Sequence, residues 1–95
     1  MPEGNAKPPE PDALLAFPTA FPIKIMGRRE GEFAQSVLAI VLKHAPDFSA
    51  ASMEMRPSRK GKYLSLTVTV NATSREMLDA LYRELCDHPS VVMVL

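Results

Sequence analysis

The chain contains a single cysteine, Cys86, among its 95 residues. One cysteine forms no internal disulfide, and with the two distant histidines, His44 and His88, it completes no recognisable set of zinc ligands. We therefore expect no metal and no cofactor, and nothing in the sequence requires an oxidising compartment. Cys86 falls near the end of a predicted helix, whereas reactive thiolates favour helix N-termini, so we interpret it as a small, partly buried hydrophobic residue.

Long apolar runs and an excess of either charge are also missing. The longest uninterrupted apolar stretch covers residues 37–42 and is far too short to span a bilayer. The N-terminal MPEGNAKPPEPDA has no apolar core like that of a signal peptide. Eleven basic residues balance eleven acidic ones, which disfavours a dedicated binder of nucleic acid or of an anionic membrane. The expected location is the cytoplasm.

The length predicts one domain with a proline-rich extension. Residues 1–13 contain four of the nine prolines and almost no apolar side chains, so we expect a disordered tail. The domain is predicted to occupy residues 14–95, and residues 14–17 form a short apolar lead-in to it.

Alternation and helical spacing predict six elements after this tail. Residues 21–26 alternate as a strand that Gly27 stops, and residues 30–44 repeat their apolar positions at helical spacing. Residues 51–56 form a marginal edge strand, and residues 63–71 form the clearest strand of the chain. A capping box from Thr73 to Glu76 starts a helix that runs to about Asp87, and residues 90–95 form the last strand.

This order of elements predicts an α+β, ferredoxin-like βαββαβ sandwich. Right-handed crossovers place both helices on one face of a four-stranded antiparallel sheet with strand order 4-1-3-2. Each strand offers one apolar row to the helices, and the opposite face carries polar and cationic side chains.

The turn after the first predicted strand is the candidate site for an anion. Gly27 would allow close approach to the backbone, and the start of the helix presents unpaired amides. Arg28 and Arg29 add forked donors, and Lys24 extends the positive field. Glu30 and Glu32 lie in the same turn, so any affinity is expected to be modest.

A second basic segment forms the hairpin between the second and third predicted strands. It carries Arg56, Arg59, Lys60 and Lys62, with Tyr63 as the adjacent aromatic residue. This segment is a solvated hairpin tip or a contact for an acidic protein partner. Sheet surfaces that bind RNA usually add several stacking aromatics, so RNA binding ranks below these two interpretations.

Several separated motifs resemble the YbeD-like family of small bacterial proteins. The motifs are FPTAFPIKIMG, HAP, SRKGKYLSLTVTVNAT, LYREL and VVMVL, in this order between residues 17 and 95. The resemblance implies a ferredoxin-like fold similar to the ACT-type regulatory domains of amino-acid metabolism. Such domains bind small effectors at dimer interfaces near the first strand–helix turn.

We therefore expect a non-enzymatic regulatory module that binds a small molecule or a protein partner. The alternative is an acylphosphatase-type enzyme, which would hold phosphate with an arginine of the first turn aided by an asparagine, here Asn71. A weaker alternative is an RNA-binding module. The uncharged last strand, residues 91–95, is expected at a sheet edge. A second copy would cover this edge in a homodimer; the alternative cover is the lead-in, residues 14–17, folded back.

Overall fold

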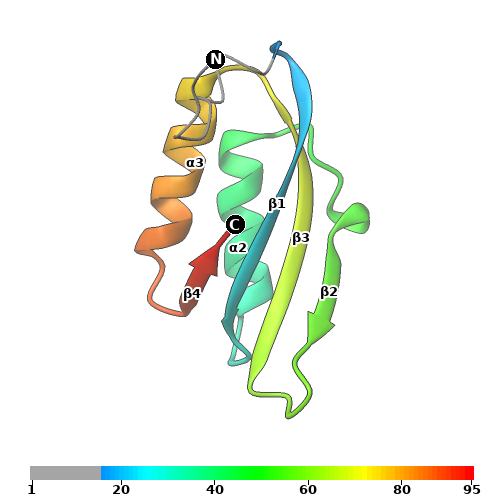
Figure 1. Cartoon of the computed structure of the whole chain (residues 1–95), viewed down its shortest axis with the longest axis vertical. Helices are drawn as coiled ribbons and strands as arrows, with labels where there is room; N and C mark the ends of the chain where they lie inside the picture. The colour runs from blue at the N-terminus through cyan, green and yellow to red at the C-terminus, as the bar shows by residue number, and fades with distance from the viewer. Residues whose placement is uncertain (1–15) are drawn as a thin grey trace, which may run out of the picture.

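The computed structural model describes residues 16–95 as one four-stranded antiparallel sheet with both α-helices on one face (Figure 1). The strands lie in the order β2-β3-β1-β4, which confirms the predicted fold and strand order. In chain order the elements are β1 (Thr19–Arg28), α2 (Phe33–His44), a 3-10 turn (Ala50–Ser52), β2 (Glu54–Pro57), β3 (Tyr63–Ala72), α3 (Arg75–Asp87) and β4 (Val91–Val94).

The core lies between the helices and one face of the sheet, as the alternation of side chains predicts. Ile23 and Ile25 of β1 are fully buried, and their neighbours on β3 are fully buried as well. The two helices contribute their apolar stripes to the same core. The fully buried residues are Ile23, Ile25, Val37, Val41, Leu66, Val68, Val70, Ala72, Leu81 and Leu85.

The predicted stop of the first strand at Gly27 is wrong. β1 continues through Gly27 to Arg28, and Gly27 lies in register with Leu64 of β3. A Cβ atom on Gly27 would lie 2.3 Å from Cζ of Phe33 and 2.5 Å from the carbonyl oxygen of Ser90. The glycine therefore makes room for the Phe33 ring and does not form a turn.

Both helices begin at other residues than predicted. α2 starts at Phe33 rather than at Glu30, because Gly31 adopts a positive φ of 48° ahead of it. α3 is capped by Ser74 and not by Thr73, since the Ser74 hydroxyl accepts a hydrogen bond of 3.1 Å from the Met77 amide. Neither helix is long and apolar enough to cross a membrane.

The second strand is shorter than predicted and begins at Glu54 rather than at Ala51. Residues 51 and 52 belong to the 3-10 turn, and Met53 is its C-cap. The strand does lie at the sheet edge, as expected, and Pro57 ends it. The predicted disordered tail, residues 1–13, and the first two residues of the lead-in fall outside the described part of the chain.

Candidate functional site

The fold brings the two predicted basic segments together at one end of the sheet. The Arg29 amide donates a hydrogen bond of 2.8 Å to the Lys62 carbonyl, which fastens the loop after β1 to the β2–β3 hairpin. Arg28 lies in register with Tyr63. The Arg29 guanidinium lies beside Gly61 of the hairpin, since a Cβ atom placed on Gly61 would be 3.4 Å from Nη1 of Arg29. Figure 1 shows the loop and the hairpin at the same end of the molecule. We call this surface the basic end; it comprises Arg28, Arg29, Arg59, Lys60 and Lys62.

Positive charge exceeds negative charge at the basic end. Glu30 and Glu32 are the nearby carboxylates in the sequence, and the Ser90 hydroxyl donates a hydrogen bond of 2.9 Å to Oε1 of Glu30. Within residues 16–95 the ion pairs join other groups, namely Lys43 and His44 with Glu84, and Arg75 with Asp79. The cations of the basic end therefore have no carboxylate partner in this part of the chain.

The backbone of the predicted anion-binding turn is already engaged. The Arg28 amide donates to the Ser90 carbonyl at 2.9 Å, and the Glu30 amide donates to the Arg28 carbonyl at 2.9 Å. The Phe33 ring covers Gly27, so no ligand can approach this glycine from that side. This corrects the predicted close approach of a ligand to Gly27. Because the Arg28, Arg29 and Glu30 amides are engaged, the side chains of Arg28 and Arg29 are the donors that these residues offer to an anion.

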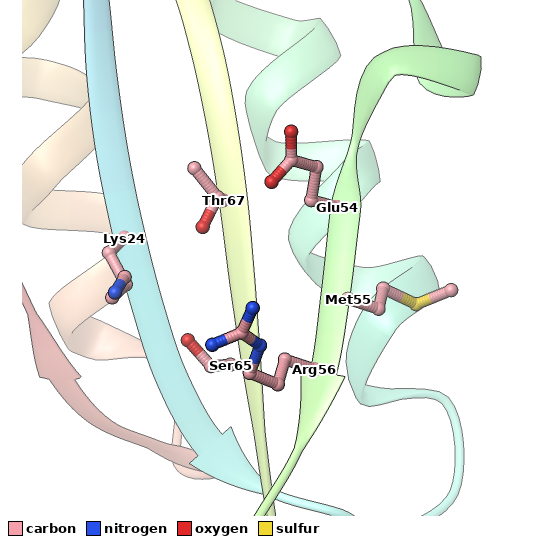
Figure 2. Close-up of a pocket in the computed structure, with 6 residues that line it drawn as sticks. All are labelled: Lys24, Glu54, Met55, Arg56, Ser65 and Thr67. Atoms are coloured by element: carbon pink, nitrogen blue, oxygen red, sulfur yellow. The ribbon is translucent and has the colours of Figure 1, made fainter.

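Lys24, a cation of the predicted polar face, lies on the sheet surface that the helices do not cover. Arg56, which the sequence assigned to the hairpin, lies on the same surface. We call this surface the open face. Arg56 pairs in register with Ser65, and Lys24 pairs with Thr67, so the two cations flank β3 (Figure 2). Figure 2 shows the Arg56 guanidinium directed over β3 towards Ser65.

Two shallow hollows adjoin each other on the open face. One has a volume of about 210 Å³ and includes Glu54 and Thr67 in its lining, and the other has about 220 Å³ and includes Met26 and Tyr63. Both are lined by Lys24, Arg56 and Ser65. They therefore form one continuous depression that leads towards the basic end.

His44 is the last residue of α2, and its side chain is held against α3. Its Nε2 lies 2.8 Å from Oε1 of Glu84, and Nζ of Lys43 lies 3.2 Å from the same oxygen. The hydrogen bond from His44, and then that from Lys43, lower the pKa of the Glu84 carboxyl below its usual value. Glu84 was not identified from the sequence, because its partners are some forty residues away on another helix.

His88 is likewise engaged in a structural contact. The Ser90 amide donates a hydrogen bond of 3.1 Å to Nδ1 of His88, and the imidazole meets the Phe33 ring edge-on at a centroid distance of 6.2 Å. Cys86 is exposed, which corrects the expectation that it is partly buried.

The geometry opposes the acylphosphatase alternative. Asn71 pairs in register with Ala20, whereas Arg28 lies eight residues further along β1. At about 3.3 Å per residue this separates the asparagine from the first-turn arginines by about 26 Å. Asn71 instead donates to a carboxylate oxygen of Asp47 at 3.4 Å. The two groups that would hold one phosphate thus lie at opposite ends of the sheet.

Comparison with known proteins identifies relatives of the whole domain. The model of a family described as "Protein of unknown function (DUF493)" matches residues 12–95. A UPF0250 protein of Bordetella pertussis is 56% identical over 88 residues, which cover 93% of this chain and 96% of the relative.

Two solved structures are similar in fold at low sequence identity. The H. pylori protein HP0495 is 14% identical with a TM-score of 0.64, over 95% of this chain and 98% of that protein. The ACT domain from the GTP pyrophosphokinase of Chlorobium tepidum, in its solution structure, is 13% identical with a TM-score of 0.64, over 81% of this chain and 83% of that domain. At these identities the likeness concerns the fold alone.

Proposed function

The chain belongs to the DUF493 family of proteins of unknown function, and from its structure we propose that it is a non-enzymatic module that binds an anionic group at its basic end. The group is a carboxylate or phosphate of a small effector or of a partner protein. Family membership agrees with the resemblance to YbeD-like proteins that the sequence motifs indicate.

One observation carries the proposal: the hydrogen bond from the Arg29 amide to the Lys62 carbonyl, at 2.8 Å. It fixes two cationic segments, separated by thirty residues in the sequence, in one place. Guanidinium groups bind carboxylates and phosphates through paired, charge-assisted hydrogen bonds. Arg28 and Arg29 have no competing carboxylate among residues 16–95, so these donors are available to a ligand.

The non-enzymatic part of the proposal is supported by the use of the titratable side chains. His44 is bonded to Glu84, and Nδ1 of His88 accepts the Ser90 amide, so both rings serve the fold. The shared fold with an ACT domain is a fold-level analogy that favours a regulatory role. We place this activity in the cytoplasm, in keeping with the single cysteine and its exposure.

Thermal unfolding in the presence of small anions tests the proposal. A ligand that binds only the folded state raises the melting temperature, and the increase grows with the ratio of ligand concentration to dissociation constant. Citrate and phosphate at millimolar concentrations should raise it above the value in sodium chloride of equal ionic strength. The increase should vanish in the double variant Arg28→Ala, Arg29→Ala and persist in Arg83→Ala, a control on the exposed side of α3. An increase that survives in the double variant, or that chloride reproduces, would contradict the assignment.

A further inference from the structure

We propose that the open face is a second binding surface, which adjoins the basic end at Arg28 and takes an acidic segment of a partner protein with apolar side chains next to its carboxylates. The surface is defined by the strand register and by the two adjoining hollows. It does not depend on binding of a small anion at the basic end.

The register arranges the open face in three rows across the sheet. The first row contains Glu54, Thr67 and Lys24, and the second contains Arg56, Ser65, Met26 and Met93. The third contains Tyr63 and Arg28. Cations thus alternate with apolar side chains and hydroxyl groups, and Glu54 is the one carboxylate of these three rows.

The cations of the open face are available to a partner. The ion pairs formed within residues 16–95 lie on the helices and do not include Lys24, Arg28 or Arg56. The apolar members are accessible as well, since Tyr63 is 41% exposed and Met93 is 46% exposed. A partner that offers carboxylates and apolar groups together would satisfy both kinds of side chain.

Charge disfavours a second copy as the occupant. The three rows carry Glu54 as their carboxylate against the cations Lys24, Arg28 and Arg56. Two such faces placed together therefore leave a surplus of positive charge, which is repulsive.

The composition of the face disfavours single-stranded nucleic acid. Bases bind to open sheets by stacking on aromatic rings, usually two or more. Tyr63 is the aromatic residue of the three rows, and methionines occupy the neighbouring apolar positions. Methionine side chains adapt to varied apolar side chains of a protein partner instead.

The size of the face predicts a transient complex. The four strands have ten, ten, four and four residues, about seven on average. At about 3.3 Å per residue and about 4.8 Å between strands, the whole open face has an area of about 440 Å². A stable interface takes about 800 Å² from each partner. We therefore expect a dissociation constant in the micromolar range and a strong dependence on salt.

Fluorescence anisotropy with a synthetic peptide tests the inference on the full chain. The probe is a labelled twelve-residue peptide of Glu-Glu-Leu repeats, and the matched peptide has Gln-Gln-Leu repeats. The acidic peptide should bind at least tenfold more tightly at low salt, and the difference should fall as salt rises. The double variant Lys24→Ala, Arg56→Ala should lose at least tenfold in affinity, whereas Arg83→Ala should not change.

Mapping of amide chemical shifts with the same peptide needs no variant and locates the contact. Shifts at Lys24, Met26, Ser65 and Thr67 support the inference. They should persist in Arg29→Ala, which removes a cation of the basic end but none of the three rows, so a failure of the anion site is distinguishable from a failure of this surface. Shifts on the helices, equal binding of the two peptides, or tighter binding of a labelled oligouridylate would overturn it.

Discussion

At the scale of single residues, Gly27 owes its identity to the aromatic ring packed against it. The space beyond its Cα is occupied by Phe33, which is 3% exposed, and by the backbone of Ser90. This contact couples the end of β1 to the start of α2 and to the loop before β4. The basic end depends on this coupling, because the Arg28 amide donates to the same Ser90 carbonyl.

Gly27→Ala should destabilise the domain by about 2–3 kcal/mol, because a buried ring and a backbone carbonyl must both move to admit a methyl group. Gly31→Ala is the control: it meets open space, and its positive φ of 48° should limit the cost to about 1 kcal/mol. Urea unfolding measures both. A double-mutant cycle of Gly27→Ala with Phe33→Leu should show a coupling energy of about 1 kcal/mol. If Gly27→Ala costs less than about 0.5 kcal/mol, the packing of Phe33 against Gly27 does not explain the glycine.

Glu84 should make stability depend on pH in the acid range. Its pKa is lowered in the folded state by hydrogen bonds from His44 and Lys43, whereas the unfolded value is about 4.3. The unfolded chain therefore binds more protons, so the contribution is complete above about pH 5 and is lost as the pH falls through the folded pKa.

The variant Glu84→Gln should accordingly show a shallower loss of stability between about pH 5 and pH 3 than the wild type, measured by urea unfolding. An NMR titration of the Glu84 carboxyl in His44→Gln should find its pKa closer to the usual value. Identical pH profiles in wild type and Glu84→Gln would rule out the lowered pKa.

At the scale of elements, the sequence predicts the faces of strands better than the ends of helices. The alternation through Ile23, Ile25, Leu66 and Val68 identifies the buried face, because burial on a pleated strand has a period of two. The true start of α3 is not predictable in this way. Thr73 and Ser74 both fit an N-cap, and their backbone geometry decides between them.

Ser74→Ala should therefore cost about 1 kcal/mol, because it leaves the Met77 amide without its hydroxyl acceptor. For a domain of this size, that corresponds to a decrease of about 4–8 °C in the melting temperature. Thr73→Ala serves as the matched control and should change the melting temperature by less than about 2 °C, because Thr73 is not the capping residue. The reverse order of the two effects, measured by thermal unfolding, would restore Thr73 as the cap.

At the scale of the whole molecule, a chain of zero net charge presents a surface of uneven charge. The cations of the basic end and of the open face lie away from the helices, where the described ion pairs are found. The fold was predictable because the order of elements and one-sided alternation leave few topologies. The joining of the two basic segments was not predictable, since it depends on a backbone hydrogen bond between loops that are distant in the sequence.

The edge position of β4 predicts self-association. Val92 is 53% exposed and Met93 is 46% exposed, and the strand carries no charged residue or proline to protect its edge. Sedimentation at tens of micromolar should detect a homodimer, and Val92→Lys should shift it to monomer. A wild-type protein that sediments as a monomer at all concentrations would exclude the homodimer.

The most direct measurement of the central claim is an amide chemical-shift titration of the full chain with citrate, phosphate and a panel of amino acids. We predict saturable shifts at Arg28, Arg29 and the hairpin residues Arg59, Lys60 and Lys62 together, because one hydrogen bond joins these segments. The shifts should disappear in Arg28→Ala, Arg29→Ala and remain in Arg83→Ala. Shifts elsewhere in the chain only, or no shifts at millimolar ligand, would contradict an anion-binding function for this end of the sheet.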